Sequence, residues 1–392
     1  MQGLTQSIDL NMSRRLSTLI MVAFTLIMTM AGCGPNWQAS LTGPEGTPFL
    51  VDRGVLEGME DLAVEVDGQV GVPLERVLWQ AGCQVIDTIE VIEPEGARHA
   101  FTWSEIAADT LWLENGELYI DGALLPVSRL EIAADPLLDG VEVSITDLAP
   151  TAAHALGLPA PAQATGEALP VPAANHVLLL FLDGLGYLRH GEALAEDLIP
   201  NLAALEDPLL GLTVYPPCTS VASAALLTGA SAQASGVDRR GIRKTEIETL
   251  FDVASAGGLQ VAAVEGNALA FNLRSAQMQL SGDRDGNGST DDNVLANSLA
   301  VLEKGMPELL FVHFHGIDDA GHTYGPGAPQ EDAAIREVDA AVGKILEALP
   351  GNTLVIIFAD HGMHAVQEEA RQGNHGHLIA RDMYIPVLIT SK

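Results

Sequence analysis

Basic residues are scarce in this chain. Its 392 residues include 19 Lys and Arg against 52 Asp and Glu, which gives a formal net charge of −33. Such a surface has no excess of cations to neutralise a phosphate backbone, so we expect no nucleic-acid binding through a basic surface. The same charge repels anionic substrates at long range. Phosphate chemistry would therefore need local cations, and bound metals are their usual source.

Cysteines are also few, and Cys83 and Cys218 do not suggest a disulfide framework. The third, Cys33, follows a basic start and an apolar run that ends in Met-Ala-Gly-Cys. This order is typical of an export signal, and its ending resembles the bacterial lipoprotein signal, which implies cleavage before Cys33 and lipidation of its thiol. We expect an extracytoplasmic protein anchored to the membrane, at the cell surface or in the periplasm. An ordinary signal peptide or membrane anchor is the alternative.

Composition divides the rest of the chain. After a signal peptide over residues 1–32, residues 33–48 are rich in Gly, Pro, Ser and Thr and are predicted to be a linker. Residues 49–140 have short apolar segments between Asp-Gly and Asn-Gly turns, which predicts a small, mostly β domain of unknown role. Residues 141–392 form the predicted catalytic domain. Its long apolar strands alternate with helical segments, which predicts an α/β fold with a largely parallel sheet covered by helices on both faces.

Metal-ligand residues follow three of these apolar strands. Asp183 ends the first, Asp318 and His322 follow the second, and Asp360 and His361 end the third. The carboxyl ends of parallel strands meet at one edge of a sheet, which is where such folds hold ligands. Without bound cations the mutual repulsion of these carboxylates would be costly.

A further pair, His375 and His377, lies near the end of the chain. Six or seven oxygen and nitrogen ligands fit two metals better than one. Two ions can hold both the attacking and the leaving oxygens of an in-line displacement.

Thr219 is the candidate nucleophile. It follows a strand-like segment and two prolines and precedes a run of small residues with helical character. At the N-terminus of a helix, backbone N–H groups and the helix dipole favour a developing alkoxide and a phosphoryl group. Taken alone, the segment fits a plain helix N-cap as well. The metal ligands elsewhere in the chain favour the nucleophile.

Taken together and in order, these residues resemble the signature of the alkaline phosphatase superfamily, and within it the type I phosphodiesterase and nucleotide pyrophosphatase branch. The resemblance covers residues 175 to 392 and implies two zinc ions. One would be held by Asp183, Thr219, Asp360 and His361, and the other by Asp318, His322 and His375. His375 is chosen over His377 because of its Gly-x-His-Gly context. The resemblance also implies that Thr219 attacks phosphorus and that a metal-activated water hydrolyses the phospho-threonine.

The implied function is that of a metal-dependent phosphohydrolase, specifically a phosphodiesterase acting on a small phosphate ester. Ala222 stands where the nucleotide pyrophosphatases have an asparagine, which leaves nucleotide specificity open. Cys218 is followed by Thr-Ser-Val, which disfavours a formylglycine sulfatase. The alternatives are a phosphomonoesterase or phosphonate hydrolase with the same site, or a non-catalytic binding lipoprotein that retains the fold.

Residues 145–169 resemble a passage that in many superfamily members follows the last metal histidine, whereas here they precede the first catalytic strand. The hypothesis that follows is a circular permutation in which residues 141–170 pack beside the C-terminal strand near residues 387–390. The alternative is an N-capped helix in a linker.

A calcium loop is a further hypothesis. Residues 283–292 resemble the first half of such a loop, with Val294 where a closing glutamate is expected. The expected ligands are Asp283, Asp285 and Asn287, with Asp291 or Asp292 closing the ring. A solvated acidic turn explains the pattern equally well.

The sequence allows two interpretations of the other polar residues near these motifs. His313 and His315 either support the ligands or contact substrate, or they are hydrogen-bonded parts of the core. Arg239, Arg240 and Arg243 form a basic cluster that either contacts an anionic substrate or neutralises nearby carboxylates.

Overall fold

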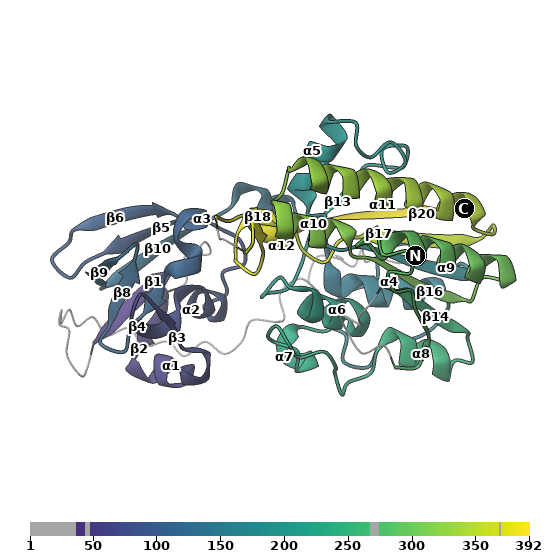
Figure 1. The fold of residues 1–392 in the computed structure, drawn as a ribbon. Helices are drawn as coiled ribbons and strands as arrows, with labels where there is room; N and C mark the ends of the chain where they lie inside the picture. The colour runs from purple at the N-terminus through teal and green to yellow at the C-terminus, as the bar shows by residue number, and fades with distance from the viewer. Residues whose placement is uncertain (1–36, 44–47, 267–273, 368–369) are drawn as a thin grey trace, which may run out of the picture.

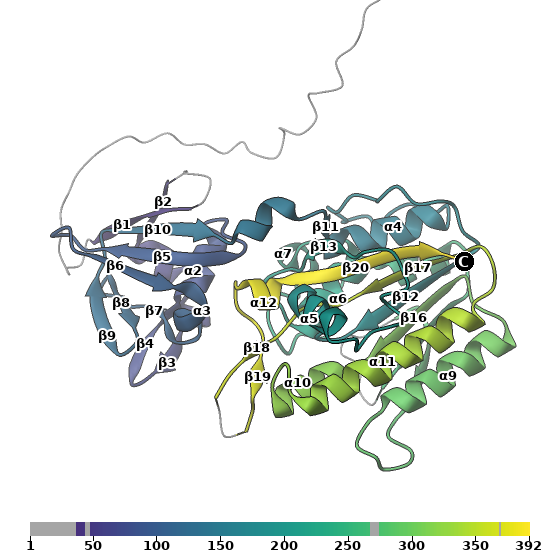
Figure 2. The same cartoon turned by 90° about the horizontal axis from the view of Figure 1, so that it is seen from above.

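A computed structural model describes residues 37–43, 48–266, 274–367 and 370–392 (Figure 1). Figures 1 and 2 show a small β-rich unit beside a larger α/β unit. Cys33 and the predicted export signal lie outside the described residues. Within the described ranges, no helix has the length and apolar character needed to cross a membrane.

The small unit contains two five-stranded sheets, which confirms the mostly β character expected of this region. The first, in the order β2-β1-β10-β5-β6, is made of β1 (Gln38–Thr42), β2 (Pro48–Asp52), β5 (Ile86–Ile92), β6 (Arg98–Thr102) and β10 (Arg129–Ala134). The second is made of β3 (Val64–Val66), β4 (Gln69–Pro73), β7 (Leu111–Trp112), β8 (Glu117–Ile120) and β9 (Ala123–Pro126). Three short helices accompany them, α1 (Arg53–Glu57), α2 (Leu74–Gln80) and α3 (Trp103–Ile106).

Part of the predicted linker is structured. Residues 38–42 form β1, whose alternate residues Ala39 and Leu41 are buried. The preceding Trp37 stacks on Trp112 at a ring-centroid distance of 6.0 Å, and its Nε1 donates to the carbonyl of Glu114 at 2.8 Å. The Gly and Pro content of this stretch indicated a tether, but its period-two apolar pattern makes it a core strand. The small domain therefore includes Trp37.

The large unit is built on an eight-stranded sheet in the order β11-β13-β20-β17-β12-β16-β14-β15. These strands are β11 (Val143–Ser144), β12 (His176–Leu182), β13 (Leu209–Leu212), β14 (Val261–Glu265), β15 (Gln277–Leu280), β16 (Leu309–Phe314), β17 (Thr353–Phe358) and β20 (Tyr384–Ser391). Only β20 runs antiparallel to its neighbours, β13 and β17. The predicted α/β fold with a largely parallel sheet is confirmed.

Helices cover both faces of this sheet (Figures 1 and 2). One face carries α9 (Asp291–Lys304), α10 (Gly316–Tyr324) and α11 (Pro329–Ala348). The other carries α4 (Leu148–Ala155), α6 (Thr219–Thr228), α7 (Ala232–Ser235) and α8 (Leu250–Ala256). Arg189 of α5 (Tyr187–Ala195) forms an ion pair with Glu331 of α11 at 2.8 Å. Near the C-terminus lie β18 (His364–Ala365), β19 (Gly373–Asn374) and α12 (Ala380–Met383).

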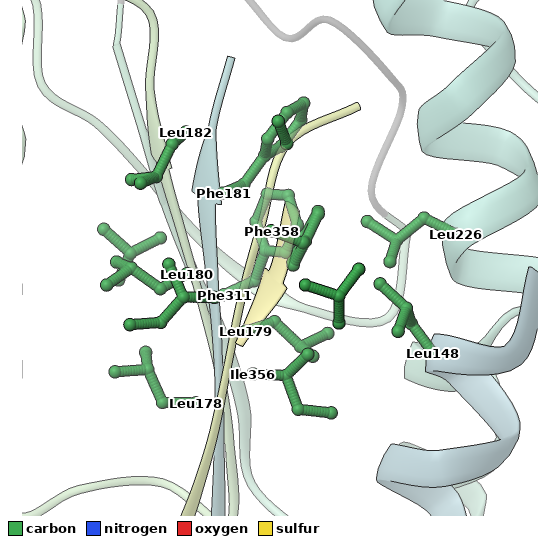
Figure 3. Close-up of a cluster of buried hydrophobic side chains, with 14 of the residues drawn as sticks. Leu148, Leu178, Leu179, Leu180, Phe181, Leu182, Leu226, Phe311, Ile356 and Phe358 are labelled. Atoms are coloured by element: carbon green, nitrogen blue, oxygen red, sulfur yellow. The ribbon is translucent and has the colours of Figure 1, made fainter. Parts of the chain in front are cut away.

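The central strand β12 is apolar along its whole length because both of its faces are covered. Figure 3 shows Leu180 and Leu182 on one face and Leu179 and Phe181 on the other, toward α4 and α6. All four side chains are buried. A continuous apolar run of this kind is what a strand between two helical layers requires. It gives the residue that follows, Asp183, a rigid support.

Residues 141–170, which were expected to pack beside residues 387–390, join the same sheet at a different position. Its strand β11 pairs with β13, and β13 in turn pairs with β20, so one strand separates β11 from the C-terminal strand. Further along, the N–H groups of Thr165 and Gly166 donate to the carbonyl of Gly229, just after α6, at 2.7 and 3.0 Å. The segment therefore supports the helix that carries Thr219. The circular permutation stays a prediction.

Trp37 tests the corrected domain boundary. Trp37→Ala removes a buried indole, so we expect the free energy of unfolding of the small domain to fall by about 3–5 kcal/mol. Leu50→Ala in β2 is the control, because Leu50 is half exposed and should change the value by less than about 0.5 kcal/mol. Denaturant unfolding followed by tryptophan fluorescence measures both. Equal effects of the two substitutions would show that Trp37 belongs to a tether.

Candidate active site

The predicted ligands lie at one edge of the large sheet. Asp183 follows β12, and Asp360 follows β17. Asp318 lies in α10, which begins directly after β16. Because β12 lies between β16 and β17 and is parallel to both, the three segments leave the sheet at the same edge. This is the edge at which open α/β sheets hold ligands.

The residues predicted for the first metal lie together. Potential ligand atoms of Asp183, Asp360 and His361 are within 4.8 Å of one another. His361 Nε2 lies 3.6 Å from Asp183 Oδ1 and 3.2 Å from Asp360 Oδ2. Thr219 is the first residue of α6, as predicted, and its Oγ1 lies 3.4 Å from the same nitrogen.

The residues predicted for the second metal are neighbours of this group. His375 Nε2 lies 3.8 Å from Asp318 Oδ1, and His322 Nε2 lies 3.5 Å from Asp318 Oδ2. The third ligand atom within 4.8 Å of those of Asp318 and His375 belongs to His361, so His322 is more peripheral than predicted. All seven predicted residues still form one continuous cluster.

The three histidines of this cluster present the same ring nitrogen to it. In each, Nδ1 faces a backbone carbonyl, namely Gly373 for His322 at 2.8 Å, Gly362 for His361 at 3.0 Å and Pro217 for His375 at 2.8 Å. A carbonyl only accepts hydrogen bonds, so Nδ1 carries the proton and Nε2 keeps its lone pair. Metal-binding histidines are oriented by such contacts in the same way.

The three aspartates have unused acceptors. Asp183 Oδ1, Asp318 Oδ1 and Asp360 Oδ2 are buried and have no hydrogen-bond partner among the described residues. Burial and the charge of Asp183 raise the pKa of Asp318 and Asp360 well above the usual value. Burial also acts to raise the pKa of Asp183, but hydrogen bonds with His313 and His315 outweigh it and hold that pKa well below the usual value.

The histidines are neutral for the same physical reason. Burial lowers the pKa of His361 to about 4 and lowers that of His322 and His375. Neutral imidazoles beside unpartnered carboxylate oxygens are the donor set of a divalent cation. The residues present therefore fit the metals that the sequence predicted.

His313 and His315 support Asp183. The fully buried His313 lies between Asp183 and Glu265, with 3.0 Å contacts to both carboxylates. His315 lies 3.3 Å from Asp183 Oδ2 and 3.1 Å from Glu265 Oε2. Glu265 was not predicted, although it is the last residue of the apolar strand β14 and Asp183 directly follows β12. Applying the strand-end rule to β14 would have found it.

Asp291 supports the start of α10. Its two carboxylate oxygens accept hydrogen bonds from the backbone N–H groups of His315 and Gly316, at 3.1 and 2.9 Å. Asp283 accepts from the backbone N–H groups of residues 286–288. No three carboxylates of this loop have ligand atoms within 4.8 Å of one another among the described residues. Calcium binding by the predicted loop ligands, Asp291 included, stays a prediction.

A pocket of about 260 Å³ opens beside Thr219. Asp183, Asp318, Ser220 and Arg240 are among the residues that line it. The basic cluster is thus divided. Arg240 and Arg243 line the pocket, while Arg239 forms ion pairs with Asp238 and Asp61 at 3.1 and 3.5 Å.

Two neighbouring residues have contacts that favour roles other than metal binding. Cys218 is the N-cap residue of α6, and burial raises the pKa of its thiol, as expected of a packed cysteine. His377 Nδ1 lies 3.0 Å from Glu75 Oε2 of α2. Burial acts to lower the pKa of His377, but Glu75 outweighs it and raises it to about 9. A protonated imidazole cannot bind a metal, which favours His375 as the ligand.

Part of this cluster lies in a region that is similar to a known protein family. Residues 267–386 match the family model of the type I phosphodiesterases and nucleotide pyrophosphatases. The match spans 120 of the 392 residues and contains five of the seven predicted ligands, while Asp183 and Thr219 precede it. It agrees with the resemblance found in the motifs of that region.

Curated relatives align over short stretches. Mouse GPI ethanolamine phosphate transferase 3, catalytic subunit, is 30% identical over 88 residues, which are 22% of this chain and 8% of that protein. An uncharacterized pyrophosphatase/phosphodiesterase of Schizosaccharomyces pombe is 33% identical over 70 residues, or 17% of this chain and 14% of that protein. The chain thus spans a small part of the length of each relative.

Two solved structures are also similar. Murine ectonucleotide pyrophosphatase/phosphodiesterase 5 is 14% identical with a TM-score of 0.45, over 56% of this chain and 88% of that one. Phosphonoacetate hydrolase from Sinorhizobium meliloti, in complex with phosphonoformate, is 17% identical with a TM-score of 0.41, over 53% of this chain and 60% of that one.

Metal removal tests the donor set. A cation that binds only the folded protein stabilises it by about 2.7 kcal/mol at one hundred times its Kd, so chelation should lower the unfolding midpoint. Asp318→Asn should lose much of the difference between zinc-loaded and chelated protein. Asp285→Asn, in the exposed 283–292 loop, should keep it. An equal response of the two variants in thermal melting would contradict the assignment, and a calcium-specific loss in Asp285→Asn would support the calcium loop.

Proposed function

We propose that this protein is a metal-dependent phosphohydrolase that acts as a phosphodiesterase through Thr219. The observation that carries the proposal is the position of Thr219 Oγ1, at the start of α6 and 3.4 Å from a histidine in the candidate metal site. The match to the type I phosphodiesterase and nucleotide pyrophosphatase family supports it. A lipid anchor at Cys33 and an extracytoplasmic location remain part of the proposal.

Two zinc ions would be held by the cluster as the sequence predicted, with Asp183, Asp360, His361 and Thr219 around one and Asp318, His322 and His375 around the other. When bound, such ions supply positive charge to the phosphate and lower the pKa of the nucleophile. The chain itself orients the donors. His313 and Glu265 fix Asp183, and backbone carbonyls fix the three histidines.

Thr219 would carry the reaction in two displacements. Its Oγ1 forms a bond to phosphorus as the ester P–O bond breaks, the hydroxyl proton passes to solvent, and the departing alkoxide takes up a proton from solvent to leave as the alcohol. Water then forms a new P–O bond as the bond to Thr219 breaks; the water loses a proton, Thr219 regains one, and the phosphate monoester is released. The N–H groups of Val221 and Ala222 donate to the carbonyl of Cys218. Those of Thr219 and Ser220, at the very start of α6, are available to the phosphoryl oxygens.

Substitution of Thr219 tests the nucleophile. Thr219→Ala should lower turnover of bis(4-nitrophenyl) phosphate by at least about 10³-fold, because it removes the hydroxyl that lies beside His361 Nε2. Metal content should stay nearly unchanged, since the carboxylate and imidazole donors remain. Thr219→Ser is the matched control and should keep part of the activity.

Retained activity in Thr219→Ala would refute the assignment. The same assay with 4-nitrophenyl phosphate compares a diester with a monoester. Faster hydrolysis of the monoester would favour the phosphomonoesterase alternative.

A further inference from the structure

A second pocket, of about 330 Å³, adjoins the candidate active site. Among the described residues, its lining includes Arg76, Arg240 and Arg371 together with Asn374 and His375, and no Asp or Glu. The pocket beside Thr219 is lined by Asp183 and Asp318 as well as by two arginines. In a chain with 52 acidic and 19 basic residues, three guanidinium groups around a cavity without a described carboxylate form a local positive site.

Two of these arginines lack carboxylate partners in the described part of the chain. Arg53, Arg98 and Arg189 all form ion pairs with Asp or Glu. No described carboxylate lies within 4.0 Å of the guanidinium of Arg76 or Arg240. Arg76 contacts the Asp238 carbonyl, and Arg240 contacts the ring of His375. Arg76 is half-buried and Arg240 is exposed. A half-buried guanidinium is stabilised by an anion, which a ligand can supply here, and the exposed Arg240 is free to turn toward the same ligand.

Arg76 is held in place before any ligand binds. Its Cζ lies 4.9 Å from the ring centroid of Tyr215, and Nη1 donates to the carbonyl of Asp238 at 3.5 Å. Tyr215 in turn packs against Trp79 at 5.4 Å between ring centroids. A guanidinium fixed on an aromatic face loses little freedom when it binds an anion.

The two pockets share residues, which relates the arginines to the reacting centre. Arg240 and Cys218 line both, and Cys218 directly precedes Thr219. Arg240 Nη2 lies 3.2 Å from His375 Nε2. Arg76 comes from α2 of the small domain, which Figure 1 shows beside the large unit. The site therefore includes a residue from each domain.

We propose that this arginine-lined pocket binds a second anionic group of the substrate, so that the small domain takes part in substrate selection through Arg76. The inference rests on the proposed function. It narrows the substrate class to phosphate esters that carry another phosphate, phosphonate or carboxylate group close to the scissile phosphate. It also assigns a role to the small domain, which recognises the end of the substrate that is distant from the scissile bond.

Binding measurements test the inference without turnover. The metal-loaded full chain is titrated in a calorimeter with propylphosphonate and with ethane-, propane- and butane-bisphosphonates. At least one bisphosphonate should bind the unsubstituted protein about tenfold more tightly than propylphosphonate, because its second group reaches the arginines. Arg76→Gln should remove this advantage and change the Kd of propylphosphonate by less than about twofold.

Two further variants complete the test. Arg76→Lys keeps the charge but not the planar fork, so it should retain part of the advantage. Arg98→Gln removes an exposed guanidinium that pairs with Glu90 in the same domain and should retain all of it. Equal affinities for all ligands in the unsubstituted protein, or an undiminished advantage in Arg76→Gln, would overturn this inference alone. Failure of every ligand to bind would overturn it together with the proposed phosphate site.

Discussion

The burial of three carboxylates at one edge of the sheet is the constraint on which this structure depends. Asp183 and Asp360 are almost completely shielded from water, and Asp318 lies beside them. Each has an oxygen without a hydrogen-bond partner in the described structure, an arrangement that is expensive to maintain without a counter-charge. The raised pKa of Asp318 and Asp360 reflects this cost, and divalent cations would allow all three to ionise. The sheet order makes this crowding unavoidable.

The surrounding structure is arranged to hold these groups still. Asp183 contacts His313 of the neighbouring strand β16, which in turn contacts Glu265 of β14. Asp291 holds the start of α10, which carries Asp318. Segment 141–170 supports the end of α6 through Gly229. Hydrogen bonds of this type fix the orientation of the side chains that bind a metal. Catalysis by positioning and charge neutralisation, as phosphoryl transfer requires, suits such a framework.

Much of this site could be predicted because its signals are local. A strand that ends in Asp is visible in a few residues, and the parallel topology then brings Asp183, Asp318 and Asp360 together. Glu265 and His313 could not be paired in the same way, since their contact depends on β14 lying next to β16. The strand at residues 38–42 was missed because Gly and Pro outweighed a short alternating pattern. The hydrogen bonds of Asp291 could not be predicted either, because their donors, the N–H groups of His315 and Gly316, are distant in sequence.

The proposed two-metal site is tested most directly by locating the metal ions. Anomalous diffraction at the zinc edge, from crystals grown with zinc, places each ion without reference to activity. We expect two peaks, one in contact with Asp183, Asp360 and His361 and the other in contact with Asp318 and with His322 or His375. No peak at the carboxylates, or a peak elsewhere with the three aspartates unoccupied, would contradict it.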